Sequence, residues 1–304
     1  MKQGDLAKAG ETAIAAIESQ ERLDGLAEKL QSAVRRAFEA AGPAQRTLKN
    51  LLHGTWLGHP LHVVITDIPV GAWTAALVMD LLDDGSRRSR HATGADAAVA
   101  VGIAGAVMAA APGLADWHHT SGAARRSGLV HGLLNTAALA LYTGSLPMRR
   151  SGRRTGGKAL SGLGYAVVLA AAYIGGHLVY RLRVGVDHST DGSGPAEFVP
   201  VMSVEQLPER QPRRIQVDGR SVVIVRRGTR VAALAEVCSH LGGPLAEGRV
   251  EGEAIVCPWH GSRFSLDNGS VIEGPATMPQ PLYEARVHQG RIEIRRAAPT
   301  PQAA

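Results

Sequence analysis

Two cysteines and two histidines, set in two short motifs, are the residues of this chain best suited to metal chemistry. Cys238 and His240 form a C-x-H motif, and Cys257 and His260 form a C-x-x-H motif, with sixteen residues between the two. The chain of 304 residues contains no other cysteine. Thiolate and imidazole are ligands of zinc and of iron–sulfur centres. The pattern therefore predicts a metal centre built from two loops.

Two kinds of metal centre use this set of ligands. In a mixed-ligand [2Fe–2S] centre, two cysteines hold one iron and two histidines hold the other. A structural zinc ion also binds two cysteines and two histidines, but its ligands usually come as C-x₂₋₄-C followed by H-x₃₋₅-H. Here each motif supplies one cysteine and one histidine, which favours the iron pair. Structural zinc is the alternative.

The residues around the two motifs resemble the Rieske iron–sulfur family over about residues 201–297. Beyond the four ligands, the shared features are Gly242-Gly243, the run His260-Gly261-Ser262-Arg263-Phe264, the turn Asp267-Asn268-Gly269, and Gly274-Pro275. The resemblance implies an all-β domain with one Rieske [2Fe–2S] cluster. In such a domain Cys238 and Cys257 would hold the buried iron, and His240 and His260 would hold the outer iron that takes the electron.

The resemblance also assigns roles to residues near the ligands. Ser262 would donate a hydrogen bond to the cluster, and Pro275 would cover it. Gly243 and Trp259 stand where the cytochrome bc type has a second pair of cysteines, so the disulfide of that type cannot form. Phe264 replaces a tyrosine whose hydroxyl raises the potential, and it has no donor. We therefore predict a ferredoxin-like or intermediate potential, below the high end of the roughly −150 to +300 mV Rieske range.

Apolar residues are concentrated before this domain, in four stretches at 61–82, 96–115, 129–146 and 159–180. At ~1.5 Å per residue such stretches can each cross a hydrocarbon core ~30 Å thick. We predict a four-transmembrane-helix bundle over residues 59–184, with a soluble alanine-rich bundle as the alternative. The run from His59 to His62, followed by Asp67 to Trp73, resembles an uncharacterised family of bacterial four-helix membrane domains with an H-P-x-H motif. That resemblance implies a bacterial cell membrane but no reaction.

Three further segments complete the predicted organisation. Residues 1–58 form a helical lead-in, with an amphipathic helix over 6–41 that breaks near Gly25 and a short helix over 44–53. This lead-in could pack on the protein itself, or serve as a membrane-interface or dimerisation helix, which would make a homo-oligomer. Residues 185–200 are rich in Gly, Ser and Pro and predict a flexible linker to the Rieske domain at 201–297. Residues 298–304 form a tail.

Polar residues gather at one end of the predicted bundle, where its first helix begins. The candidates for a membrane haem or quinone site are His59, His62, Asp67, His131 and His177. Polar groups at membrane depth normally face the bundle interior and mark functional sites. Three interpretations stay open: a b-type haem between two of His62, His131 and His177, a quinone or proton-handling site, and a purely structural cluster.

These features together predict a membrane-anchored one-electron carrier between a membrane redox partner, quinone or haem, and another protein. A redox sensor or scaffold, whose cluster regulates the membrane domain, is the alternative. An oxygenase needs a catalytic domain with a 2-His-1-carboxylate iron site, which we do not expect in this chain. The net charge of +6 lies in arginine clusters beside apolar stretches, which speaks for the lipid bilayer and against nucleic acid. Basic loop residues divide eight to six between the two ends, so the side of the Rieske domain stays open.

Overall fold

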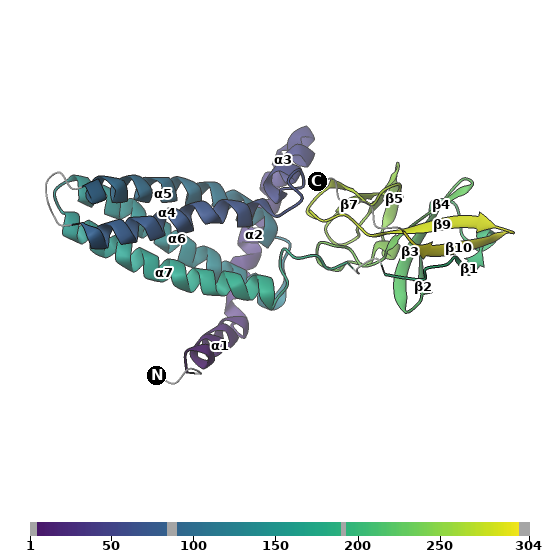
Figure 1. The fold of residues 1–304 in the computed structure, drawn as a ribbon, viewed down its shortest axis with the longest axis horizontal. Helices are drawn as coiled ribbons and strands as arrows, with labels where there is room; N and C mark the ends of the chain where they lie inside the picture. Colours follow the sequence, from purple (N-terminus) through teal and green to yellow (C-terminus); the bar gives the residue numbers. More distant parts are fainter. Residues whose placement is uncertain (1–4, 84–89, 190–192, 298–304) are drawn as a thin grey trace. The chain divides into compact units, whose positions relative to one another are not determined.

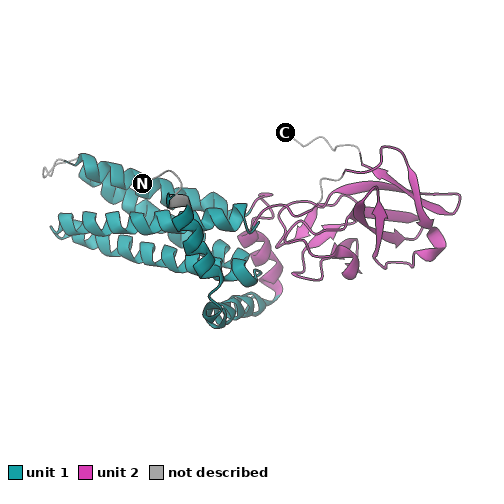
Figure 2. Cartoon of the chain, turned by 90° about the horizontal axis from the view of Figure 1, so that it is seen from below, with its two compact units in different colours: residues 1–42, 60–184 teal, residues 43–59, 185–304 magenta. Residues whose placement is uncertain are grey.

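The chain divides into two compact units (Figure 2). The computed structural model describes residues 5–83, 90–189 and 193–297. Unit 1 comprises residues 1–42 and 60–184, and unit 2 comprises residues 43–59 and 185–304. Residues 43–58 of the expected lead-in, together with His59, which was expected to begin the membrane domain, therefore group with the C-terminal domain.

Unit 1 contains a bundle of four long helices (Figure 1). These helices are α4 (Leu61–Leu82), α5 (Arg90–Trp117), α6 (Gly122–Arg150) and α7 (Arg154–Tyr180). Helix α4 packs along α5 and α6 along α7, while α5–α6 and α7–α4 contacts close the bundle. The four expected helices are confirmed, each longer than its apolar stretch or equal to it.

Three of the bundle helices, α4, α5 and α7, are long and apolar enough to cross a membrane. Helix α6 is equally long, but His131, Asn135 and the arginines at its two ends reduce its hydropathy. It packs along α7, and its residues Ala138 and Tyr142 are buried in the bundle core with Trp73 of α4. The most polar helix of the four thus contributes to the centre of the bundle.

The lead-in forms two helices that pack on the bundle. They are α1 (Asp5–Glu18) and α2 (Arg22–Ala40), and the chain turns between them at residues 19–21. The expected break near Gly25 is therefore wrong, because Gly25 lies inside α2 and has open space beside it. The buried Gln31 side chain donates to the carbonyls of Trp117 (3.2 Å) and Thr120 (3.0 Å). These hydrogen bonds fasten α2 to the loop between α5 and α6.

Unit 2 is an antiparallel β domain of two sheets. The larger sheet has the strand order β1-β10-β9-β4-β3-β2, and the smaller has β5-β6-β7-β8. The strands are β1 (Val199–Ser203), β2 (Arg213–Val217), β3 (Arg220–Arg227), β4 (Arg230–Ala235), β5 (Arg249–Glu251), β6 (Ala254–Val256), β7 (Arg263–Ser265), β8 (Val271–Glu273), β9 (Leu282–His288) and β10 (Arg291–Arg296). Two of the hairpins of unit 2, β2–β3 and β9–β10, turn through left-handed backbone at Asp218-Gly219 and Gln289-Gly290, where the dipeptides Asp-Gly and Gln-Gly favour such turns.

The core of unit 2 reaches the predicted ligands. Val223, Leu234, Ile255 and Phe264 are fully buried in one cluster that also contains Cys238 and Cys257. Alternation along the strands directs these apolar side chains inward from both sheets. The two cysteines are therefore part of the apolar core. The chain segment before the membrane helices adds α3 (Gln45–His53) to this unit, beside β8.

Candidate metal centre

Two loops with the same internal hydrogen bonds carry the four predicted ligands. In the first loop, Cys238 N–H donates to the Gly243 carbonyl (2.9 Å), and Gly242 N–H donates back to the Cys238 carbonyl (2.9 Å). In the second, Cys257 N–H donates to the Ser262 carbonyl (2.8 Å), and Gly261 N–H donates back to the Cys257 carbonyl (3.1 Å). Gly242 and Gly261 have φ values of 79° and 76°, which L-residues rarely adopt. Each motif therefore forms a closed turn with its cysteine at the base.

The two cysteines face each other in the interior. Both are buried, and their thiols form a hydrogen bond with each other. The hydrogen bond with Cys238, helped by the backbone N–H groups of Trp259 and His260, lowers the pKa of Cys257 to about 7 despite burial. Sharing that proton with Cys257, together with burial, raises the pKa of Cys238. One thiolate therefore forms readily, and thiolate is the form that binds iron.

The two histidines meet nearer the surface. The His240 and His260 rings are half-buried, with centroids 5.1 Å apart and planes at 90°. Burial lowers the pKa of His260, which favours the neutral imidazole that binds metals. Trp259, next to His260, is 55% exposed. An inner thiol pair and an outer imidazole pair match the needs of a cluster with Cys₂ on one iron and His₂ on the other.

Glycine at position 243 keeps the space between the loops open. A Cβ there would lie 2.8 Å from Cys257 Sγ and 3.1 Å from the Trp259 ring. This position is one of the two where the cytochrome bc type has an extra cysteine. The absent side chain thus lets the two loops approach each other closely.

The other predicted site residues lie beside the ligand loops. Ser262 is fully buried, and its Oγ accepts a hydrogen bond from Ala276 N–H (3.0 Å). That bond ties the second ligand loop to the segment with Gly274 and Pro275, which are also buried. Because Ser262 Oγ accepts from Ala276, its own proton is available to another acceptor. Phe264 packs in the core and offers no donor.

Gln280 is a supporting residue that the sequence gives no signal for. Its side chain is 2% exposed, and its Oε1 accepts from Ser239 N–H (3.1 Å). Its Nε2 donates to the Ala235 carbonyl (2.8 Å) and to the Val237 carbonyl. One amide thus secures the backbone on both sides of Cys238. A lone glutamine just before a strand has no distinctive spacing, so only the folded structure reveals this role.

Two segments that flank the bundle helices in the chain also form hydrogen bonds near the site, one to a ligand loop and one to the segment with Gly274 and Pro275. Asn50 of α3 accepts from Gly274 N–H (2.9 Å) and donates to the Ile272 carbonyl (3.3 Å). His188 N–H donates to the Ser239 carbonyl (2.9 Å). Tyr283 Oη likewise donates to the Ser193 carbonyl (2.9 Å). Residues 185–189 and 193–198, expected to be part of a flexible linker, are thus held to the β domain by hydrogen bonds.

Replacing Asn50 by alanine should loosen the segment with Gly274 and Pro275. The change removes two hydrogen bonds from a half-buried position, with an expected cost of about 1–2 kcal/mol for that segment. Amide hydrogen exchange of residues 271–276, measured on the full chain, should become roughly five- to thirty-fold faster. Thr47→Ala, on an exposed position of the same helix, is the control. Unchanged exchange in Asn50→Ala would contradict a supporting role for α3.

The structure separates the five membrane-domain candidates. His62 and His131 lie together, with ring centroids 6.3 Å apart. His177 Nε2 instead pairs with Glu18 Oε1 of α1 (2.8 Å). Asp67 is exposed on α4. His59 is exposed and belongs to unit 2.

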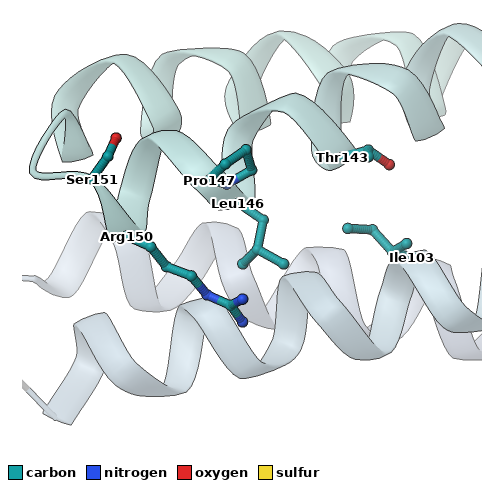
Figure 3. A pocket seen from close by; sticks show the side chains of 6 residues that line it. All are labelled: Ile103, Thr143, Leu146, Pro147, Arg150 and Ser151. Carbon is teal, nitrogen blue, oxygen red and sulfur yellow. The ribbon is translucent and has the colours of Figure 1, made fainter.

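A shallow groove on the bundle surface lies between α5 and α6 (Figure 3). Its lining residues are Ile103, Thr143, Leu146, Pro147, Arg150 and Ser151. The groove is open and mostly apolar, and its lining includes no histidine or carboxylate. It therefore lacks the proton-accepting groups on which the quinone interpretation rests.

Comparison with known proteins identifies both parts of the chain. Residues 197–284 match the Rieske [2Fe-2S] domain family, and residues 58–188 match the family described as "Predicted membrane protein (DUF2231)". Ferredoxin CarAc of Metapseudomonas resinovorans is 30% identical over 83 residues, which are 27% of this chain and 78% of that protein. The anthranilate 1,2-dioxygenase ferredoxin subunit of Burkholderia cepacia is 27% identical over 99 residues, 33% of this chain and 92% of that protein.

Among solved structures, the ferredoxin of carbazole 1,9a-dioxygenase from Nocardioides aromaticivorans IC177 is similar. It is 31% identical, covering 34% of this chain and all of its own, with a TM-score of 0.33. The two ferredoxins align with about a third of this chain or less, while the helices have their own family match at residues 58–188. The chain belongs to the Rieske [2Fe–2S] family through its C-terminal domain, which is joined to a predicted membrane domain of the DUF2231 family.

Proposed function

We propose that this protein is a membrane-anchored one-electron carrier. Cys238 and Cys257 would hold one iron of the [2Fe–2S] cluster, and His240 and His260 would hold the other. The observation that carries the proposal is the pairing of buried thiols with half-exposed imidazoles on two matched loops. The similarity to two ferredoxins supports a carrier role. When bound, the cluster supplies a reversible one-electron change.

The residues of the domain suit transfer through the histidine side of the site. The cysteines are enclosed by the core, whereas the two imidazoles are only half-buried. Electrons would therefore enter and leave at His240 and His260. The exposed Trp259 ring beside His260 adds an apolar contact surface for a partner protein. Aromatic residues of this kind often supply much of the binding energy at protein–protein interfaces.

The partners in this proposal are a redox group of the membrane, quinone or haem, and a second protein. The apolar helices α4, α5 and α7 support an integral position in the bilayer. The similarity of the H-P-x-H region to bacterial membrane domains supports the bacterial cell membrane. A homo-oligomer stays a prediction.

A redox sensor or scaffold is the second candidate function, and one observation favours it. Asn50 holds the segment beside the ligand loops, and its helix α3 is followed in the chain by α4 after residues 54–60. A change in the oxidation state of the cluster that shifts this segment could therefore alter the position of α3 and of the chain that leads into the membrane domain.

Electron transfer measured in vesicles separates the two functions. The purified full chain would be reconstituted with a quinol donor in the lipid and a soluble one-electron acceptor in the medium. A carrier should sustain turnover that stops when the cluster is absent. A sensor should take up about one electron per cluster and then stop, and that result would overturn the carrier proposal.

Replacing Ser262 by alanine should lower the reduction potential. The Ser262 proton is positioned to stabilise the added negative charge of the reduced cluster, because Oγ already accepts from Ala276. A hydrogen bond to a charged group contributes about 1.5–3 kcal/mol. Since 1.36 kcal/mol and 59 mV each correspond to a factor of ten for one electron, the reduction potential should fall by about 65–130 mV. A redox titration followed by EPR measures it.

The matched control for this titration is Ser265→Ala. Ser265 lies three residues further on, in β7, and its Oγ accepts from Asp267 N–H (3.2 Å). Its loss should leave the potential unchanged. A Ser262→Ala potential equal to that of the control would remove Ser262 from the proposed site.

A further inference from the structure

The four-helix bundle is built from two hairpins that repeat the same arrangement. In the first hairpin, Trp73 of α4 lies against Gly102 of α5, where a Cβ would come within 2.2 Å of its ring. In the second, Tyr142 of α6 lies against Gly164 of α7, where a Cβ would lie 3.0 Å from its ring. The two aromatic rings stack on each other, with centroids 4.0 Å apart and planes at 6°.

The same arrangement recurs eleven residues along each helix, where a histidine takes the place of the aromatic residue. His62 precedes Trp73 by eleven residues, and His131 precedes Tyr142 by eleven. Gly113 follows Gly102 by eleven residues, and Gly175 likewise follows Gly164. Eleven residues make about three turns, so each histidine shares a face with its aromatic residue. His62 lies against Gly113, and His131 against Gly175. The bundle therefore contains a second matched pair, made of imidazoles.

Both imidazoles are anchored in the same way. His62 Nδ1 lies 2.9 Å from the Ala109 carbonyl of α5, and His131 Nδ1 lies 2.9 Å from the Ala171 carbonyl of α7. Because a carbonyl only accepts, Nδ1 carries the proton in both rings. Each Nε2 then presents a lone pair. Metal-ligating histidines are oriented by this kind of second hydrogen bond.

We infer that His62 and His131 form a bis-imidazole site for a b-type haem. Their ring centroids are 6.3 Å apart, with planes at 87°. Metal–nitrogen bonds of about 2 Å on each side, plus about 1 Å from each nitrogen to its ring centre, predict a separation of about 6 Å. Cofactor sites in helix bundles are built from such inward side chains on different helices. Here α4 and α6 each supply one.

Ligand number and charge favour haem over a bare metal ion. Within residues 5–83, 90–189 and 193–297, no three His, Cys, Asp or Glu side chains are placed to hold one ion. Haem needs only two axial ligands, because its macrocycle supplies the other four. Two neutral imidazoles would also leave a divalent ion uncompensated in a low-dielectric bundle. The dianionic macrocycle neutralises ferrous iron.

Asn135 forms a hydrogen bond with one of the two imidazoles. Asn135 Nδ2 lies 3.1 Å from His131 Nε2 and also donates to the His131 carbonyl (2.9 Å). The matched position in α4 is Thr66, whose hydroxyl bonds to the Val63 carbonyl instead. Binding would therefore displace one hydrogen bond, and the amide would keep its backbone partner.

This inference deepens the proposed function by naming the redox group in the membrane domain. It rests on the proposed carrier for its role, whereas haem binding can be measured independently. A haem at this site would give the membrane domain its own one-electron centre.

Optical and EPR spectra of the full chain, purified in detergent and titrated with hemin, test the inference. We expect one haem per chain, a Soret band, and the strongly anisotropic low-spin ferric signal of perpendicular axial imidazoles. His62→Ala and His131→Ala should each lose that signal, and His131→Met should keep a six-coordinate haem at a raised potential. His177→Ala, whose ring pairs with Glu18, is the matched control and should bind haem normally.

Two results would overturn the inference. The first is the absence of haem binding while the cluster EPR signal is intact, which leaves the carrier proposal standing. The second is haem binding that survives both His62→Ala and His131→Ala, which would show an adventitious site. Loss of the cluster signal with haem retained would instead reject the carrier and keep the haem site. Circular dichroism of each variant checks that the bundle is folded.

Discussion

A Cys257→Ser protein should contain no [2Fe–2S] cluster. Serine cannot supply the thiolate that iron–sulfur ligation requires, and the Cys238 thiol would lose the partner that faces it. The purified variant should therefore lack both the visible absorption and the reduced-state EPR signal of the cluster. Non-haem iron and acid-labile sulfide should each fall from two per chain to near zero. The effect is all or none, because three ligands leave one iron incompletely bound.

A change at one of the outer ligands tests whether these residues bind iron or only stabilise the fold. His260→Cys retains a ligand but replaces a neutral imidazole with a charged thiolate. The reduction potential should then fall towards that of an all-cysteine cluster, about −400 mV in plant-type ferredoxins. His288→Ala is the control, because this exposed histidine lies in β9 and pairs with Glu293 (3.4 Å) of β10. A Cys257→Ser protein with normal iron, or a zinc ion in the wild-type chain, would reject the proposed ligands.

The ligand motifs could be predicted because their chemistry lies in short stretches of sequence. Cysteine and histidine at fixed spacing limit the possible centres to a few, and glycines at 242 and 261 report turns with positive φ. The hairpins at Asp218-Gly219 and Gln289-Gly290 were predictable for the same reason. What escaped prediction depends on contacts between distant residues. Gln280 and Asn50 act on loops 41 and 224 positions away.

In the membrane domain, too, local features could be predicted from the sequence and contacts between distant residues could not. The length and apolar composition of four stretches predicted the four helices, and the positions of the histidines in the sequence predicted the end at which they gather. It did not predict which histidines meet, because that depends on packing between helices. His177 is paired by Glu18, a residue 159 positions away in the lead-in. The spacing of eleven between histidine and aromatic residue was present in both hairpins, but it has meaning only once the rings are seen to stack.

Replacing Arg149 by leucine should destabilise the membrane domain by about 3–5 kcal/mol, the usual cost of removing one member of a buried ion pair. The Arg149 side chain is fully buried, and its guanidinium pairs with both carboxylate oxygens of Asp80, itself only 7% exposed. It also contacts Asp96 (3.2 Å) and the hydroxyl of Ser161 (2.9 Å). These partners lie on α4, α5 and α7, so one side chain on α6 connects all four helices.

Thermal unfolding of the full chain in detergent, followed by helical circular dichroism, measures this cost. Arg150→Leu is the matched control, because Arg150 is the next residue and is exposed at the surface groove (Figure 3). It should unfold close to wild type. An Arg149→Leu/Asp80→Leu double variant should recover part of the loss, since both buried charges are then removed. If the double variant is less stable than the two single changes added together, the Arg149–Asp80 pair is not the main contact that holds this end of the bundle.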